Sequence, residues 1–131
     1  MNIDDTLSRL EHQLDIDRIR AWLATQDAFT TDWAVTYLAE SLFFAEVVRD
    51  GLPPLGAGSK VLEIGGGLGY VSRVLATLGM DVTCFEPASR GFSRMTELSG
   101  LINEAWKPVA PKLHWRAEPF TASKVSDERF D

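Results

Sequence analysis

The stretch that decides the fold is VLEIGGGLGYVSRVLATLGMDVTCFE, residues 61–86. An apolar run leads into four glycines among residues 65–69, and a second apolar run ends at Glu86. Between them, apolar residues recur at the spacing of a helix: Val71, Val74, Leu75 and Leu78. A strand, a helix and a second strand in this order predict a parallel βαβ unit. Because glycine costs more backbone entropy than other residues, the cluster indicates a loop that requires glycine.

The same alternation continues toward the C-terminus. We predict strands at KVLEI (60–64), DVTCFE (81–86) and KLHWRAE (112–118), a second helix marked by Phe92, Met95, Leu98, Ile102 and Ala105, and a polar loop over 119–129. Strands that alternate with helices are typical of right-handed crossovers and a parallel sheet. The predicted fold class is therefore α/β, with a Rossmann-like, partial sheet of about three strands after an N-terminal helical segment.

The chain divides into three predicted parts: an N-terminal helical segment (1–50), a turn-rich connector (51–59) and a partial ligand-binding domain (60–131). Within the first part we predict helices in 3–14 and 15–26, and a third from Asp32 to about Asp50, capped by Thr30 or Thr31. On the third helix, Ala34, Tyr37, Phe44, Ala45 and Val48 share one face, whereas Phe43 and Val47 lie on the opposite, more charged side. Apolar residues on two sides predict a lid over a ligand or padding against the sheet.

Composition excludes several classes of function. The 131 residues are 45% hydrophobic with a net charge of -6, and the basic residues are scattered, which disfavours nucleic-acid binding. Cys84 is the only cysteine, and with two distant histidines, His12 and His114, it makes no metal-ligand set. Because the start of the chain does not read as a signal peptide and no apolar run reaches bilayer length, we expect a cytoplasmic protein without a membrane partner.

The glycine cluster can be interpreted in three ways. A phosphate-binding loop needs GxxxxGK(S/T), and no Lys followed by Ser or Thr stands at that spacing. The dinucleotide pattern GxGxxG fits Gly65 and Gly67 but meets Tyr70 at its third place, so an NAD(P)-binding oxidoreductase domain stays an alternative. The third pattern, ExGxGxG, begins at Glu63 and ends at Gly69.

This third pattern resembles motif I of the class I S-adenosylmethionine-dependent methyltransferases, most clearly from Lys60 to Pro87. The resemblance implies an S-adenosyl-L-methionine site at Glu63, Gly65, Gly66, Gly67, Gly69, Glu86, Ala117 and Glu118. In the family's arrangement the glycines lie under the cofactor and Glu63 helps to hold its methionine end. Glu86 would bind the ribose hydroxyls, Glu118 the adenine amino group, and Ala117 would line the adenine pocket.

Elementary chemistry agrees with these roles. One carboxylate can accept two charge-assisted hydrogen bonds from a vicinal diol, as Glu86 would from the ribose. The cofactor carries a sulfonium and an ammonium group and no phosphate, which suits a loop with acids and without Arg or Lys. The residues identify no catalytic base.

The resemblance also implies what lies beyond these strands. In the family a fourth strand pairs with the first and brings most catalytic and substrate-binding groups, and SDERFD (126–131) is typical of the approach to it. We therefore expect a fragment of a longer enzyme or, if the chain is complete, self-association through the uncovered sheet edge. A non-catalytic partner or oligomerisation module with a half-fold is a further hypothesis. The methyl acceptor is unknown, with a small molecule or a protein favoured over nucleic acid.

Overall fold

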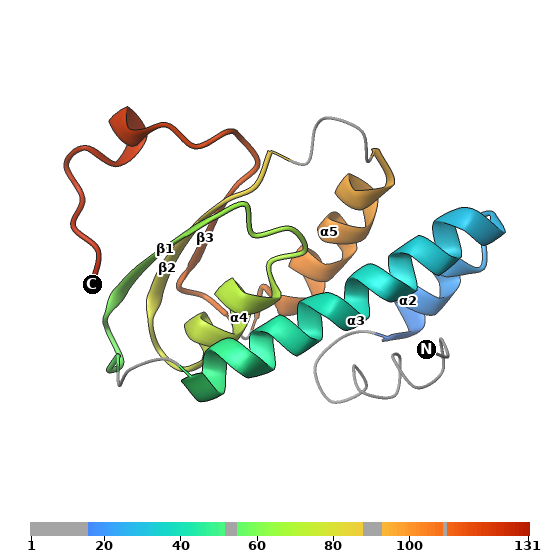
Figure 1. Ribbon diagram of the computed structural model, residues 1–131, viewed down its shortest axis with the longest axis horizontal. Helices are drawn as coiled ribbons and strands as arrows, with labels where there is room; N and C mark the ends of the chain where they lie inside the picture. Colours follow the sequence, from blue (N-terminus) through green and yellow to red (C-terminus); the bar gives the residue numbers. More distant parts are fainter. Residues whose placement is uncertain (1–15, 52–54, 88–92, 109) are drawn as a thin grey trace.

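The computed structural model describes residues 16–51, 55–87, 93–108 and 110–131 of the chain (Figure 1). The helix predicted in 3–14 and the expectations for His12 and Phe92 lie outside the described residues, as does the side chain of Met95. The described elements are α2 (Ile16–Leu23), α3 (Ala28–Gly51), β1 (Lys60–Ile64), α4 (Tyr70–Thr77), β2 (Asp81–Phe85), α5 (Ser93–Trp106), β3 (Leu113–Arg116) and the 3₁₀-helix η1 (Ala122–Val125). This order confirms the predicted α/β class.

The three strands form one parallel sheet in the order β1-β2-β3. Lys60 lies beside Asp81 and Ile64 beside Phe85, while Val82 lies beside Leu113 and pairing continues to Arg116. Because all three strands run in one direction, their carboxyl ends meet at one edge of the sheet. The glycine loop, Glu86 and Ala117 therefore follow neighbouring strands at that edge.

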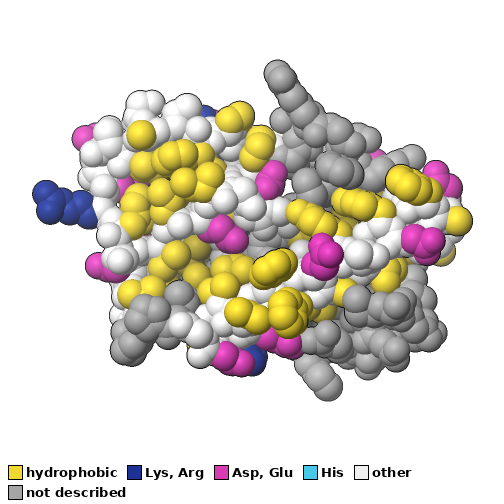
Figure 2. Space-filling view, viewed as in Figure 1, with side chains coloured by type: hydrophobic (Ala, Val, Ile, Leu, Met, Phe, Trp, Pro, Cys, Tyr) yellow, Lys and Arg dark blue, Asp and Glu magenta, His cyan; other side chains and the backbone are white. Residues whose placement is uncertain are grey.

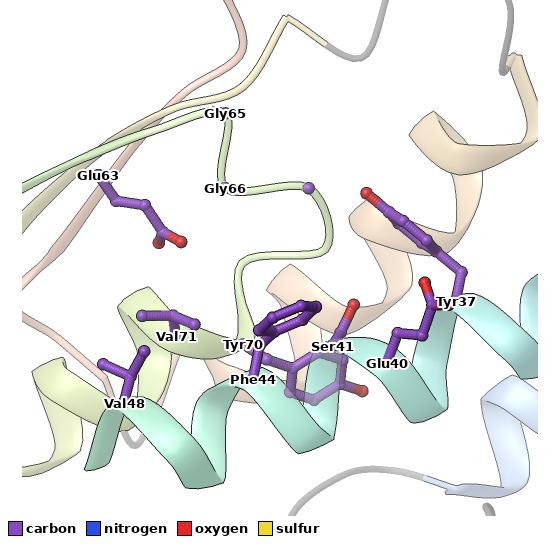
Figure 3. Close-up of a pocket in the computed structure, with 11 residues that line it drawn as sticks. Tyr37, Glu40, Ser41, Phe44, Val48, Glu63, Gly65, Gly66, Tyr70 and Val71 are labelled. Atoms are coloured by element: carbon purple, nitrogen blue, oxygen red, sulfur yellow. The ribbon is translucent and has the colours of Figure 1, made fainter. Parts of the chain in front are cut away.

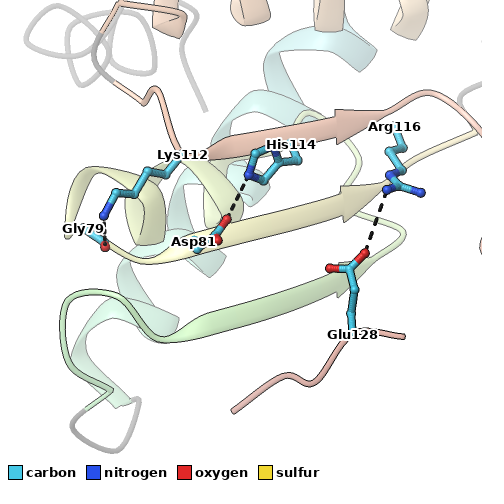
Figure 4. Close-up of polar contacts among 6 residues, drawn as sticks. All are labelled: Gly79, Asp81, Lys112, His114, Arg116 and Glu128. Carbon is cyan, nitrogen blue, oxygen red and sulfur yellow. Dashed lines mark hydrogen bonds and ion pairs between the residues drawn. The ribbon is translucent and has the colours of Figure 1, made fainter. Parts of the chain in front are cut away.

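The helices cover one face of this sheet. In Figure 1, α4 lies between the sheet and the long helix α3, with α5 beside it. One hydrophobic core joins the layers, and it includes Val82 from β2, Leu75 from α4 and Leu38 from α3. On the opposite face, His114 Nε2 lies 2.9 Å from Asp81 Oδ1, and Arg116 lies 4.0 Å from Glu128 (Figure 4). The N-terminal helices thus share the core of the sheet domain.

Helix α3 begins four residues earlier than predicted. Asp27 Oδ1 accepts a hydrogen bond of 2.7 Å from Thr30 N, so Asp27 caps the helix and the prediction of Thr30 or Thr31 as the cap was wrong. A carboxylate in this position satisfies an N–H group that has no partner within the helix. None of the helices among the described residues combines the length and apolar character needed to cross a bilayer.

Helix α3 buries one stripe of its surface. Ala34, Leu38, Leu42 and Ala45 are buried, whereas Phe44 is 58% exposed. Tyr37, Phe44 and Val48, which were predicted to share one face, lie along the same side of the helix. The helix packs on α4 through a stripe of smaller side chains, which places Phe44 and Phe43 toward solvent.

Replacing Asp27 by alanine should lower the free energy of unfolding by about 1 kcal/mol, because the cap of α3 is lost. Asp27→Asn keeps a side-chain oxygen that can accept from Thr30 N and should cost much less. Urea unfolding followed by circular dichroism measures both variants. Wild-type stability of Asp27→Ala would show that the cap contributes nothing.

Among the described residues, hydrogen bonds to the free edge of β1 occur only at the first residue of the strand. Asp131 N donates to Lys60 O over 2.8 Å, and Lys60 N donates to Asp131 Oδ2 over 2.9 Å. The segment after η1 therefore runs toward β1 on the side away from β2, as a chain approaching that edge would. Self-association through the remainder of the edge stays a prediction.

Candidate cofactor site

The glycine loop connects β1 to α4 through three left-handed residues. Gly65, Gly67 and Gly69 have φ angles of 75°, 58° and 75°, a region that costs other residues roughly 1–2 kcal/mol. Gly65 N donates to Phe85 O over 2.8 Å, which ties the loop to β2, and Gly69 N donates to Gly66 O over 2.7 Å. Gly69 is the N-cap residue of α4. The cluster thus has a backbone reason to be glycine.

Packing within the protein gives three residues of this cluster a second reason to be glycine. A Cβ atom on Gly66 would overlap Cys84 Sγ, one on Gly67 would lie 2.5 Å from Tyr37 Oη, and one on Gly69 would lie 2.5 Å from Trp115 Cζ3. The sequence was interpreted as making room for a ligand, and the structure shows that the protein's own side chains already use part of that room. Of the four glycines in this loop, Gly65 alone would place a Cβ where no described atom outside its chain neighbours lies within 4 Å.

Glu86 lies directly against this loop. Its side chain is buried, with 7% of the residue exposed, and its Oε2 accepts a hydrogen bond of 2.7 Å from Gly67 N. The structure thus brings together two residues assigned to one site although 19 positions separate them. A carboxylate is held where the loop's backbone and the end of β2 meet.

Glu63 is held by the start of α4. Its Oε2 accepts hydrogen bonds from Ser72 N, over 3.0 Å, and from Ser72 Oγ. A carboxylate at this end of a helix interacts favourably with the helix dipole and satisfies an N–H group that lacks a helical partner. Glu63 therefore supports the helix that follows the loop, and it also faces the cavity described next.

A cavity of about 350 Å³ lies between α3 and the glycine loop (Figure 3). One wall consists of Glu63, the loop residues 65–67, Tyr70 and Val71; the other comes from α3 and consists of Tyr37, Glu40, Ser41, Phe44 and Val48. Two carboxylates and no basic side chain occur among these lining residues. The cavity therefore suits a neutral or cationic part of a ligand better than a phosphate.

The wall formed by α3 was not assigned to the site from the sequence. The sequence pattern that could have indicated this wall is the presence of apolar residues on two sides of the helix. The buried stripe of α3 packs on the sheet domain, and a neighbouring stripe lines the cavity beside the loop.

Tyr37 covers part of the loop. In Figure 3 its hydroxyl points from α3 toward the loop, and its ring stacks on Trp33 with centroids 5.5 Å apart. Burial raises the pKa of Tyr37, and the negative charges of Glu86 and Glu40 raise it further. The phenol therefore stays neutral beside these carboxylates at neutral pH.

Tyr70 is a core residue. It is 1% exposed, and its hydroxyl finds no hydrogen-bond partner among the described residues. Burial raises its pKa. The residue that stands at the third glycine place of the dinucleotide pattern therefore packs in the core.

The two residues assigned to the adenine end lie apart from the cavity. Ala117 is exposed, and Glu118 Oε2 accepts a hydrogen bond of 2.7 Å from Lys124 Nζ. Neither belongs to the described residues that line the cavity. Their assignment stays a prediction, and Lys124 competes with any amino group for Glu118.

Arg73 supports the loop from behind and was not singled out in the sequence. It is fully buried, it donates to Leu68 O and to Asn103 Oδ1, and its guanidinium lies 5.5 Å from the centre of the Trp115 ring. Burial lowers its pKa to about 10. A single arginine on an amphipathic helix is normally a surface residue, so the pattern contains no signal for this role.

Comparisons with known proteins give relatives without an assigned activity. No family model matches the chain. It is 31% identical over 134 aligned residues to the uncharacterised proteins MT1557 and Rv1509 of Mycobacterium tuberculosis, from strains CDC 1551 and H37Rv. The match covers 98% of this chain and 43% of each relative, so the chain spans less than half the length of these proteins.

Among solved structures, similarity is partial. A SAM-dependent methyltransferase from Agrobacterium tumefaciens matches 68% of this chain and 27% of its own, with 18% identity and a TM-score of 0.45. YjhP from E. coli matches 58% of this chain and 27% of its own at 18% identity and a TM-score of 0.38. A TehB-like SAM-dependent methyltransferase from Corynebacterium glutamicum matches 60% of this chain and 44% of its own, with 18% identity and a TM-score of 0.32.

Proposed function

We propose that this chain forms the cofactor-binding part of an S-adenosylmethionine-dependent methyltransferase. The observation that carries the proposal is the buried carboxylate of Glu86 at the glycine loop, 2.7 Å from Gly67 N. Open α/β sheets bind ligands at the carboxyl ends of their strands, and Glu86 and the loop occupy that edge. A ribose needs such an acceptor for its two hydroxyl groups.

Two further features of the site suit this cofactor. Gly65 faces open space at the end of β1, where a ligand can approach the backbone. The adjoining cavity contains Glu40 and Glu63 and no basic side chain among its described lining, which suits the cofactor's ammonium group. Glu86 would hold the ribose, and Glu63 with the loop would hold the methionine end.

The cofactor, when bound, supplies a methyl group on a positively charged sulfur. The residues described here would bind and orient it, since such transfer depends largely on placing two reactants in line. Catalytic and acceptor-binding residues are not assigned to this chain.

The competing dinucleotide interpretation fits the loop less well. Its third glycine allows close packing of helix and strand, and Tyr70 fills that place with a buried aromatic ring. A dinucleotide also brings a pyrophosphate, for which the cavity's carboxylates are unsuited.

Isothermal titration calorimetry of the whole protein with S-adenosylhomocysteine tests the proposal. We expect saturable binding in the micromolar range, and no heat from NAD⁺ under the same conditions. Binding of NAD⁺ without binding of S-adenosylhomocysteine would overturn the proposal.

A further inference from the structure

The space above Gly67 is occupied by a side chain from α3. A Cβ on Gly67 would lie 2.5 Å from Tyr37 Oη and 3.4 Å from Tyr37 Cζ, so the phenol rests directly on the loop's backbone. Gly67 is also the residue whose N–H binds Glu86. The hydroxyl of Tyr37 therefore sits beside the carboxylate and the backbone to which the proposed function assigns the ribose.

We propose that Tyr37 closes the glycine loop in the ligand-free protein, and that a ligand must displace this side chain to reach Glu86. The inference rests on the proposed function and adds a gating residue to it. A ligand that carries hydroxyl groups, such as a nucleoside, can replace the contacts of the phenol with its own.

The surroundings of Tyr37 allow such a displacement. Tyr37 is only partly buried and lines the cavity of about 350 Å³, so free space adjoins its ring. Its ring stacks nearly parallel to that of Trp33, with 16° between the ring planes. Figure 2 shows hydrophobic and acidic side chains side by side over α3.

A closed loop lowers the apparent affinity, because only the open fraction of the molecules can bind. Removing the part of the side chain that reaches Gly67 should therefore strengthen binding. A ligand-contacting role for Tyr37 would give the opposite sign, and a purely structural role would change stability without accelerating association.

The test compares S-adenosylhomocysteine binding to the whole protein and to two variants, with stopped-flow kinetics and calorimetry. Tyr37→Leu shortens the side chain so that it no longer contacts Gly67. Phe43→Leu is the control: it makes a similar aromatic-to-leucine change at a residue of α3 that is 56% exposed and is not among those lining the cavity. We expect Tyr37→Leu to associate about tenfold faster and bind about tenfold tighter, with little change in dissociation. Phe43→Leu should match the wild type within about twofold.

Tyr37→Phe keeps the ring and its stack on Trp33 and removes only the hydroxyl, so it remains informative if the leucine variant folds poorly. It should associate faster than the wild type by a smaller factor. Wild-type binding combined with unchanged or slower association in the Tyr37 variants would overturn the gate and leave the proposed function intact. If neither the wild type nor any variant binds S-adenosylhomocysteine, the proposed function falls and the gate falls with it.

Discussion

Glu86→Ala should lower the affinity for S-adenosylhomocysteine by about 100-fold. The side chain is buried at the end of β2, and its carboxylate would accept two charge-assisted hydrogen bonds from the ribose. Hydrogen bonds to charged groups contribute about 1.5–3 kcal/mol each, and the loss of two therefore gives a change of about 3 kcal/mol or more. Calorimetry on the folded variant measures this loss directly.

Two matched changes separate ribose binding from support of the loop. Glu86→Gln keeps an oxygen that can accept from Gly67 N but loses the negative charge, so we expect an affinity about tenfold lower with little change in stability. Glu104→Gln alters an exposed acid on α5 that pairs with Lys107, and it should leave binding unchanged. Wild-type affinity in a folded Glu86→Ala variant would remove Glu86 from the site.

Gly69→Ala should cause a clearly larger loss of stability than Gly65→Ala. Gly69 and Gly65 share a φ of 75°, so alanine at either position costs roughly 1–2 kcal/mol of backbone strain. At Gly69 the new methyl group would also lie 2.5 Å from Trp115 Cζ3 and 2.9 Å from Arg73 Nη1. Overpacking of this kind adds roughly 1–3 kcal/mol.

Gly65→Ala is the control for the backbone term, because no described atom outside its immediate chain neighbours lies within 4 Å of its Cβ position. Chemical denaturation of the two variants should therefore show a clearly greater loss for Gly69→Ala. Equal losses would mean that Trp115 and Arg73 do not pack against the loop as described.

The strands and the helix between them could be predicted because each carries its information locally. Lys60–Ile64 was predicted with its observed bounds, and β2 differs from its prediction only in ending at Phe85. Short apolar runs bounded by glycines or a charged residue are typical of buried strands. The pattern of α4 is local as well, and this helix ends where Gly79 adopts a φ of 92°.

The features that the sequence left open depend on contacts between distant residues. The start of α3 was misplaced because Thr30, Thr31 and Asp27 are all plausible caps, and only the path of the chain selects Asp27. The contact of Tyr37 with Gly67 joins segments on opposite sides of the connector, and no local pattern encodes it.

The same reasoning applies to the glycines. From the sequence they indicated a ligand, whereas the structure shows a loop whose turns and packing also demand them. The glycine loop lies at the end of β1, as predicted, whereas the share of its space that Tyr37 occupies could not be foreseen.

A crystal structure of the whole protein with S-adenosylhomocysteine would show where the ligand binds. We predict that the two ribose hydroxyl groups lie within hydrogen-bonding distance of the Glu86 carboxylate, above the glycine loop. A ligand bound elsewhere, with Tyr37 still on Gly67 and Glu86 making no contact to the ribose, would contradict the account.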